Sequence, residues 1–490
     1  MHYLLPIDIG TTSTKILAVS TQGRTLAKVD KSYPTLHPEP DWSEQDPELI
    51  VTCILEGIHE VVKKVGTPPL AVSFSCAMHS LIAMDHSGNA LTRAILWSDA
   101  RSRPQAEQLK SGDEGNRIYQ QTGTPIHAMS PLCKLIWFRE NQPEVLKKTA
   151  CFIDIKGYVL HRLFGEYLID YSLASATGLF AVQQKKWYPP AVALAGISID
   201  QLPKPVPTYH QLNDLPSKFC QQTGLLPKTP FVIGASDGCL ANLGAMALDG
   251  SALAITLGTS GAIRTGSIAP FLHPEGKTFS YHLDDQLYIN GGPSNNGGNV
   301  FAWIQQSLFN GLASDQVFEK LTAVPPGAEG LLCLPWLHGE RAPLWNEQAT
   351  GGFLGLRPQH GPANMGRAAL EALAMNLYTI FEDLKAIPNI AVQEIRINGG
   401  LARSPLVRQI IADVFDLPVH LLVGTDGSAL GAAMLAMRAL GLIQNYHELD
   451  SWISTTSLSE PHLAHQLIYQ ERYAMFQMLS RKLQLVTGKV

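Results

Sequence analysis

A short segment near the N-terminus combines an acid, a glycine and hydroxyl side chains in a pattern suited to holding phosphate. Asp8 is followed by Gly10, Thr11 and Thr12, and then by Lys15. Backbone N–H groups of a glycine turn and threonine hydroxyls can surround phosphate oxygens, and a lysine adds positive charge. The acid could hold magnesium through water, because hard cations prefer oxygen ligands. A polar hairpin with a structural aspartate is the alternative.

A second segment of similar composition begins about half a chain length later. Gly258, Thr259, Ser260 and Gly261 form a turn between two strand-like runs. This repetition suggests a duplicated domain with a boundary near residue 245. Two such hairpins facing each other across a cleft would hold a polyphosphate from both sides, whereas either turn alone could be an ordinary β-turn.

A single carboxylate flanked by small residues follows another apolar run. Residues 231–234 form a short strand that ends just before Asp237, whose neighbours are Ser236 and Gly238. A general base must stay accessible to the hydroxyl that it deprotonates, and small neighbours permit this access. The alternative is an aspartate that caps the following helix.

Two further clusters have side chains suited to binding a polyol. Met78 and His79 follow one apolar run, and Trp97, Asp99 and Arg101 follow another. Aromatic, histidine, aspartate and arginine side chains can bind a polyol by stacking and by charge-assisted hydrogen bonds. Each of these residues taken singly could equally be packed for structural reasons.

A double glycine, Gly399 and Gly400, lies between a strand at 395–398 and a helix that should begin near Ser404 and Pro405. The missing side chains permit close packing of a flat group such as adenine or ribose. A simple turn between strand and helix is the alternative. The chain contains neither a GxGxxG fingerprint nor a GxxxxGK[ST] loop.

The elements that carry these residues alternate between strand-like and helix-like runs, which predicts the α/β class. Three strand-like runs at 4–9, 15–19 and 25–29 are joined by glycine-bearing turns, as in an antiparallel meander. Apolar residues at three- and four-residue spacing predict an amphipathic helix over 365–384. The proline-rich stretch 202–207 is expected to be a loop.

The composition excludes several classes of protein. Hydrophobic residues make up 45% of the 490 residues and charged residues only 16%, which argues against disorder, and a net charge of −5 gives no sign of nucleic-acid binding. Seven scattered cysteines without a CxxC pair favour a reduced cytoplasm over disulfides or zinc. No signal peptide is expected at the N-terminus. The apolar stretch 429–443 predicts a buried helix and not a membrane span.

Taken together, these segments resemble the FGGY carbohydrate kinases over essentially the whole chain. Residues 129–141 are similar to the first signature of the family and residues 351–371 to the second. The resemblance implies two ribonuclease-H-like domains of the actin, Hsp70 and sugar-kinase type, with an active site in the cleft between them. A sugar-binding kinase domain would span 1–245 and a nucleotide-binding kinase domain 246–490.

The resemblance also implies roles for the residues singled out above. Asp237 matches the catalytic base, and Asp8 matches the acid that organises Mg²⁺. Positions matching those that contact ATP are Thr11, Thr12, Lys15, Gly258, Thr259, Gly298, Gly400 and Ser404. Positions matching those that face the sugar are Met78, His79, Trp97, Asp99 and Arg101, together with Asp237. Asp426 is offset from an acidic position of the family and stays unassigned.

Within the family, several stretches are most similar to gluconate kinases, which implies transfer of phosphate from MgATP to D-gluconate. Xylulose kinases share the Met-His pair and the Trp-x-Asp-x-Arg pattern, so a pentulose kinase is the main alternative. Arg101, His79, Lys134 and Arg341 are all candidates for binding the gluconate carboxylate. Homo-oligomer formation is left open.

A sugar-responsive regulator or a chaperone-like ATPase on the same fold is a weaker alternative. A regulator would need a DNA-binding module and a chaperone a substrate-binding appendage, and neither is expected beside the predicted elements.

Overall fold

The computed structural model describes residues 2–424 and 426–487, which pack as two compact units. Of the described residues, unit 1 contains 2–246, 268–289 and 426–453. Unit 2 contains 247–267, 290–424 and 454–487. Both contain helices and mixed sheets, so the predicted α/β class is confirmed. The functional division at residue 245 stays a prediction, because packing alone does not show what each unit binds.

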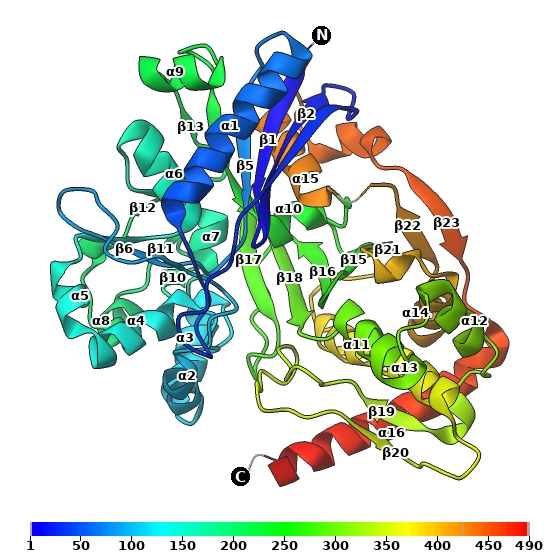
Figure 1. Ribbon diagram of the computed structural model, residues 1–490. Helices are drawn as coiled ribbons and strands as arrows, with labels where there is room; N and C mark the ends of the chain where they lie inside the picture. The colour runs from blue at the N-terminus through cyan, green and yellow to red at the C-terminus, as the bar shows by residue number, and fades with distance from the viewer. Residues whose placement is uncertain (1, 425, 488–490) are drawn as a thin grey trace. The chain divides into compact units, whose positions relative to one another are not determined.

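Unit 1 is built around a six-stranded sheet with the order β13-β14-β5-β1-β2-β3. The predicted N-terminal meander is confirmed, because β1, β2 and β3 pair antiparallel in sequence order. β5 runs parallel to β1 (Figure 1), and β14 runs parallel to β5. The strands are β1 (Tyr3–Ile9), β2 (Ser13–Ser20), β3 (Thr25–Ser32), β5 (Val72–Cys76), β13 (Gln211–Leu212) and β14 (Phe231–Ser236).

The carboxyl ends of the three parallel strands meet at one edge of this sheet. In the register, Asp8 lies beside Ser75, and Cys76 lies between Ile9 and Ser236. Parallel strands are about 4.8 Å apart, so residues at the ends of β1 and β14 are about 10 Å apart across β5. This edge therefore brings together the ends of β1 and β14, which are far apart in the sequence.

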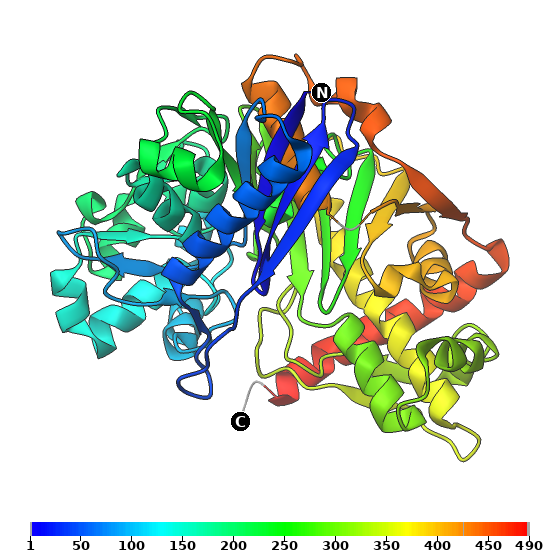
Figure 2. The same ribbon diagram turned by 45° about the horizontal axis from the view of Figure 1, so that its top comes forward.

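Helices cover both faces of the sheet. α1 (Pro47–Val65) packs on β2 and β3, and α15 (Gly427–Ala439) packs on β1 and β5 from the other face (Figure 2). α10 (Asp237–Leu243) follows β14 directly and packs against α15. The apolar stretch predicted as a buried helix is thus largely α15, whose middle is fully buried.

The remaining elements of unit 1 form smaller layers around this core. Its helices are α2 (Arg103–Lys110), α3 (Asp113–Thr122), α4 (Pro131–Asn141), α5 (Pro143–Lys148), α6 (Ile155–Phe164), α7 (Tyr171–Ser175), α8 (Pro189–Ala195) and α9 (Ser217–Thr223). Its short strands are β4 (Glu44–Gln45), β6 (Ile82–Met84), β7 (Ala94–Ile95), β8 (Cys151–Ile153), β9 (Leu168–Asp170), β10 (Phe180–Ala181), β11 (Lys186–Trp187) and β12 (Lys204–Val206), and β17 (Phe279–Asp284) packs on α7.

One expectation about unit 1 is wrong. The stretch 202–207 is not entirely a loop, because β12 pairs parallel with β9. Proline lacks an N–H donor but its φ is compatible with extended backbone, so Pro205 fits a strand that has only one neighbour.

Unit 2 repeats the hairpin-and-parallel-strand arrangement. β15 (Ala252–Leu257) and β16 (Gly261–Ser267) form an antiparallel hairpin, and β21 (Glu394–Asn398) runs parallel to β15. β22 (Val419–Leu422) is parallel to β21, and β23 (Thr455–Ser459) is antiparallel to β22. The other strands are β18 (Leu287–Ser294), which pairs next to β16, and the separate pair β19 (Leu332–Leu334) and β20 (Gly352–Leu354).

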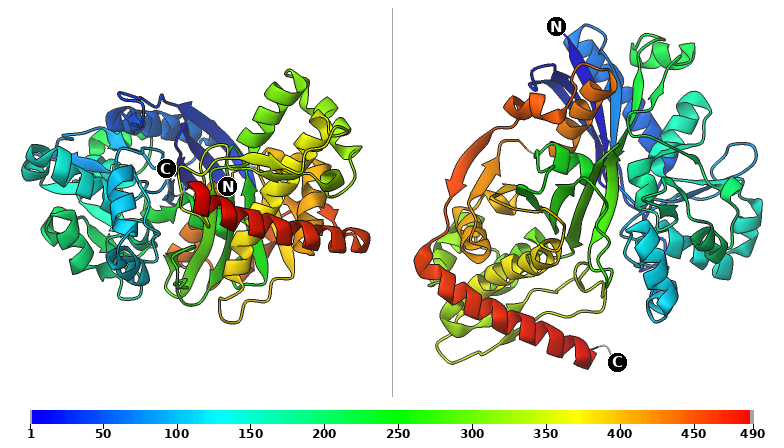
Figure 3. Two further views of the ribbon diagram at one scale, coloured as in Figure 1. Left: turned by 90° about the horizontal axis from the view of Figure 1, so that it is seen from below. Right: turned by 180° about the vertical axis from the view of Figure 1, so that it is seen from behind.

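The helices of unit 2 include the one predicted from its apolar spacing. α13 (Pro362–Leu384) contains the predicted helix 365–384 and buries the inward residues of that pattern. α14 (Pro405–Phe415) begins at the predicted residue. Figure 3 shows α16 (Leu463–Thr487) as a single long helix, which packs on α13 and α14. The others are α11 (Gly298–Trp303) and α12 (Ser314–Thr322). Among the described residues, no helix is both long enough and apolar enough to cross a membrane.

The strand that leads to Asp237 depends on a glycine. Gly234 has a φ of +75°, and the pairing of β14 with β5 shifts register between Val232 and Ala235. A Cβ at Gly234 would lie 1.7 Å from the carbonyl oxygen of Phe74. Only glycine combines this backbone conformation with so close an approach.

We expect Gly234→Ala to lower the free energy of unfolding by about 3 kcal/mol or more, since it adds a steric clash to left-handed strain. Gly66→Ala is a matched control, because Gly66 has a φ of +78° but nothing lies within 4 Å of the position that a Cβ would take there. The control should cost about 1 kcal/mol. Urea denaturation of both variants measures the difference, and equal losses would contradict the steric argument.

Candidate active site

Asp8 is held at the edge of the unit 1 sheet by two serines. Its Oδ1 accepts a hydrogen bond from Ser75 Oγ at 2.6 Å, and its Oδ2 accepts one from Ser428 Oγ at 2.8 Å. The residue is only 9% exposed. Each carboxylate oxygen has a second lone pair, so the fixed carboxylate retains acceptor capacity. Carboxylate and hydroxyl oxygens are the ligand types that suit a hard cation such as Mg²⁺.

The turn between β1 and β2 carries the other predicted phosphate-binding residues of unit 1. Thr11 Oγ1 accepts a hydrogen bond from Trp97 Nε1 at 3.0 Å, which links two residues predicted to have different roles. Thr12 is exposed at the tip. Lys15 Nζ lies 3.5 Å from a carboxylate oxygen of Asp426, and Lys28 Nζ lies 2.7 Å from the other oxygen.

Two residues near this turn were not assigned a role from the sequence. Ser428 and Asp426 come from the start of α15, more than 400 residues after Asp8, and contact Asp8 and Lys15 respectively. The sequence predicted a buried helix over 429–443 but gave no indication of the elements that the start of this helix would contact. The negative charge of Asp426 therefore offsets part of the positive charge of Lys15.

Asp237 is the first residue of α10 and is half-buried. Its Oδ1 accepts a hydrogen bond from the backbone N–H of Gly238 at 2.7 Å. The helix cap is Ser236, whose Oγ accepts from the N–H of Cys239. The capping role considered for Asp237 therefore belongs to its neighbour. A negative charge in the first turn is favoured by the helix dipole.

α7 connects the strand before Asp237 with the segment that carries His79. Ser172 Oγ lies 2.9 Å from Ser236 Oγ and also accepts a hydrogen bond from the backbone N–H of Ser236 at 3.2 Å. Just beyond the helix, the carbonyl of Ala176 lies 2.8 Å from His79 Nδ1. His79 has a φ of +68°, an uncommon conformation for a residue other than glycine that concentrates at functional sites. Met78 beside it is half-buried.

Asp99 and Arg101 form an ion pair inside unit 1. Arg101 donates from Nε and Nη2 to the two oxygens of Asp99, each at 2.8 Å, and from Nη2 to Glu44 at 2.6 Å. Its guanidinium carbon lies 3.6 Å from the ring centroid of Trp42. Both partners are almost fully buried. The structure thus uses these two predicted sugar-facing residues to hold the loop after β7 (Ala94–Ile95).

Lys134 in α4 is fully buried behind the same loop. Its Nζ donates hydrogen bonds to the carbonyl oxygens of His79 at 2.6 Å and Leu96 at 2.7 Å. Burial lowers the pKa of this amine to about 7. Lys134 therefore links the segments that carry His79 and Trp97, because both of these hydrogen bonds go to backbone carbonyl oxygens.

In unit 2, the turn between β15 and β16 is held against the start of α11. The N–H of Gly298 donates to the carbonyl of Gly258 at 2.8 Å, and the N–H of Asn299 donates to the carbonyl of Thr259 at 3.0 Å. A Cβ at Gly298 would lie 2.6 Å from the carbonyl oxygen of Gly258. Three predicted nucleotide-contacting residues, Gly258, Thr259 and Gly298, are thus neighbours.

The double glycine follows β21 at the carboxyl end of the same sheet. β21 is parallel to β15, with Asn398 beside Thr256, so Gly400 and the Gly258 turn lie at the same edge. Nothing lies within 4 Å of the position that a Cβ would take at Gly400. Ser404 is 7% exposed, and its Oγ has no hydrogen-bond partner among the described residues. Open space at Gly400 and a buried, unpaired hydroxyl at Ser404 are each compatible with a small polar, flat group.

A buried carboxylate, Glu340, organises the strand end that precedes Gly298. It accepts hydrogen bonds from Ser294 Oγ at 2.8 Å and from the N–H of Asn295 at 2.9 Å. It also accepts from Asn376 Nδ2 at 3.0 Å, and burial raises its pKa. Arg341, one of the residues considered from the sequence for binding a carboxylate, follows Glu340 directly, and its Nη2 donates to the carbonyl of Ser294 at 3.2 Å. The positive charge of Arg341 partly opposes the rise in the pKa of Glu340.

Comparisons with known proteins agree with one another over most of the chain. Models of the FGGY family of carbohydrate kinases match residues 3–244 with the N-terminal domain and residues 253–440 with the C-terminal domain. A gluconokinase of Bacillus subtilis (strain 168) is 40% identical over 98% of this chain and 96% of its own.

Two further relatives bear on specificity. A xylulose kinase of Bacillus subtilis (strain 168) is 30% identical over 91% of this chain and 90% of its own. The crystal structure of a gluconate kinase from Lactobacillus acidophilus superimposes with a TM-score of 0.96 at 32% identity, covering 100% of this chain and 99% of that one.

We expect the Lys134 amine to make stability depend on pH between about 7 and its ordinary pKa of 10.5. In this range the unfolded chain binds a proton that the folded chain has released, so the free energy of unfolding rises with pH, by up to about 1.4 kcal/mol per pH unit. Below pH 7 the lysine is charged in both states, and this pH dependence disappears.

Lys134→Met should flatten this dependence, because it removes the titrating amine. Denaturant titrations at pH 7.5 and about 9.5 on wild type and variant measure the difference, with pH values chosen inside the window that the lowered pKa defines. Lys147→Met is the control, since its side chain is 69% exposed. Parallel pH dependences of wild type and Lys134→Met would contradict the prediction.

Proposed function

The chain belongs to the FGGY family of carbohydrate kinases, and we propose that it transfers the γ-phosphoryl group of ATP to the terminal hydroxyl of D-gluconate, giving 6-phospho-D-gluconate and ADP. It is a phosphotransferase with the two-domain ribonuclease-H-like fold that the sequence predicted. The observation that carries the gluconate assignment is the 40% identity to a gluconokinase over 98% of the chain.

D-Xylulose is the second candidate acceptor, supported by the xylulose kinase that is 30% identical. Gluconate is favoured because the identity is higher and extends over more of the chain. Its carboxylate also needs hydrogen-bond donors. All four residues considered from the sequence for this contact already contact protein acceptors, so we assign the carboxylate to none of them in preference: Arg101, His79, Lys134 and Arg341.

Asp237 is assigned as the general base. It lies at the carboxyl end of β14, half-buried, with its cap function carried by Ser236. In this assignment a carboxylate oxygen of Asp237 takes the proton of the sugar hydroxyl. The hydroxyl oxygen attacks the γ-phosphorus, and the bond from phosphorus to the leaving ADP breaks. Phosphoryl transfer needs positioning and charge neutralisation more than covalent help from the protein.

Asp8 is assigned to Mg²⁺, which when bound would neutralise charge on the phosphate oxygens. The carboxylate is fixed by Ser75 and Ser428, and the strand register leaves about 10 Å between the ends of β1 and β14. That distance leaves room for a phosphoryl group and a hydroxyl between the two acids. Thr11, Thr12 and Lys15 are assigned to the phosphates.

The adenosine of ATP is assigned to unit 2. The Gly258 turn, the start of α11 and the double glycine converge at one sheet edge, where Ser404 has an unpaired hydroxyl. The backbone N–H groups of Gly258 and Thr259 and the hydroxyl of Thr259 suit phosphate oxygens. We place the reaction in the cytoplasm, in keeping with its use of ATP and with seven free cysteines.

Replacement of Asp237 by Asn tests the base assignment. We expect kcat to fall by about 10²–10⁴-fold, because the amide cannot accept the proton, while the thermal midpoint stays near that of the wild type. Asp113→Asn is the matched control, as Asp113 is also the first residue of a helix but is exposed. Steady-state assays of ADP release measure both, and wild-type turnover in Asp237→Asn would remove this residue from the mechanism.

A substrate panel tests the acceptor. With ATP and Mg²⁺ at saturation, D-gluconate should show kcat/KM at least about tenfold above D-xylulose and glycerol, a discrimination within reach of a few polar contacts. A coupled ADP-release assay measures all three. A higher kcat/KM for D-xylulose would replace gluconate by the second candidate and leave the kinase assignment in place.

A further inference from the structure

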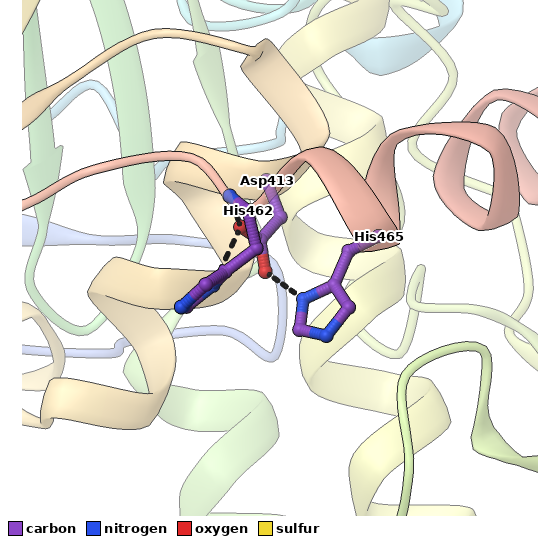
Figure 4. Close-up of side chains that lie close together, drawn as sticks. All are labelled: Asp413, His462 and His465. Atoms are coloured by element: carbon purple, nitrogen blue, oxygen red, sulfur yellow. Dashed lines mark hydrogen bonds and ion pairs between the residues drawn. The ribbon is translucent and has the colours of Figure 1, made fainter.

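Unit 2 contains a cluster of metal-ligating side chains that the proposed reaction does not use. Asp413 lies in the last turns of α14, His462 immediately precedes α16, and His465 lies in the first turn of α16 (Figure 4). Both imidazole rings are directed at the one carboxylate. The two histidines are three residues apart, so they share one side of the helix start.

The geometry of the cluster is close to that of a coordination site. His465 Nδ1 lies 2.7 Å from Asp413 Oδ2, and His462 Nδ1 lies 3.3 Å from Asp413 Oδ1. One ligand atom from each residue can be chosen so that all three lie within 4.8 Å of one another. Ions such as Zn²⁺ bind nitrogen and oxygen at about 2.0–2.2 Å, so modest side-chain rotation would bring all three into contact with one ion.

The carboxylate is held in place while the histidines remain accessible. Asp413 accepts hydrogen bonds from Gln409 Nε2 at 2.9 Å and from the backbone N–H of His462 at 2.8 Å. Its side chain is 2% exposed, whereas that of His462 is 56% exposed. Such outer hydrogen bonds orient a ligand carboxylate, and the open side admits an ion with its remaining water ligands.

A purely structural role explains only part of this arrangement. Asp413 caps the start of α16 through the His462 N–H, and the Gln409 amide supplies another donor. This docking of α16 on α14 needs neither imidazole ring. Two imidazole rings and one carboxylate would instead supply the three protein ligands of a metal site, which leaves a further coordination position for water.

We propose that Asp413, His462 and His465 bind a divalent transition-metal ion of the Zn²⁺ type. Imidazole nitrogen favours such ions over Mg²⁺, which prefers oxygen, so this site would be chemically distinct from the one assigned to Asp8. An ion here joins α14 to α16. It stabilises unit 2 by mass action, since the ligands converge only in the folded chain.

Calorimetric titration of the chelator-treated 490-residue chain with ZnCl₂, without nucleotide, tests the proposal. We expect one Zn²⁺ per chain, and binding at least about tenfold weaker in His462→Ala and His465→Ala. His462→Ala is the decisive variant, because its exposed side chain contributes little to packing. His447→Ala is the matched control, as His447 is an exposed histidine facing a single carboxylate, Asp450, and it should bind like the wild type.

Cobalt substitution gives a second readout that distinguishes the ligands. Co²⁺ at this site should give visible absorption without a thiolate charge-transfer band, and the absorption should be lost in His462→Ala. Undetectable Zn²⁺ binding to the wild type, equal affinity in wild type and both histidine variants, or a thiolate band would each overturn the proposal. Mg²⁺ in excess should not displace the Co²⁺ signal, and displacement would also count against it.

Discussion

Parallel pairing of β1, β5 and β14 governs the geometry of the unit 1 site. Because the three strands run in the same direction, their carboxyl ends must lie at one edge, and the register places Asp8 beside Ser75 and Ser236 beside Cys76. A slip of one residue in the pairing of β1 would turn Asp8 to the opposite face of the sheet. Gly234 secures the last pairing by letting β14 approach the backbone of Phe74 more closely than any side chain would permit.

The start of α15, which belongs to the C-terminal part of the sequence, packs at the same edge of the sheet. Small residues make this packing close, since a Cβ at Gly431 would lie 2.0 Å from the carbonyl oxygen of Leu240 in α10. Ser428 is thereby brought to Asp8 and Asp426 to Lys15. The electrostatic environment assigned to the phosphates thus combines two segments that lie at opposite ends of the chain.

Buried polar groups set the shape of the loops around this edge. From the sequence, Asp99 and Arg101 were considered for binding a polyol, and Lys134 and Arg101 for binding a carboxylate. In the fold they satisfy carbonyls and one another behind His79 and Trp97. Glu340 does the same in unit 2, where it fixes the strand end before Gly298. Such buried charges are stable only when fully paired, and this pairing in turn orders the loops.

Local patterns along the chain were enough to predict the class of fold, the N-terminal meander, the buried helix that became α15, α13, and the glycine and acid positions at strand ends. Apolar periodicity and the residues that turns and caps require carry this information. Only the tertiary structure shows that Ser236, and not Asp237, caps α10. It also shows that Ser428 contacts Asp8 and that Asp426 contacts Lys15. The cluster of Asp413, His462 and His465 is likewise visible only in the folded chain. Each of these contacts depends on strand register, local backbone geometry or helix docking between segments distant in sequence, and no local pattern encodes such distances.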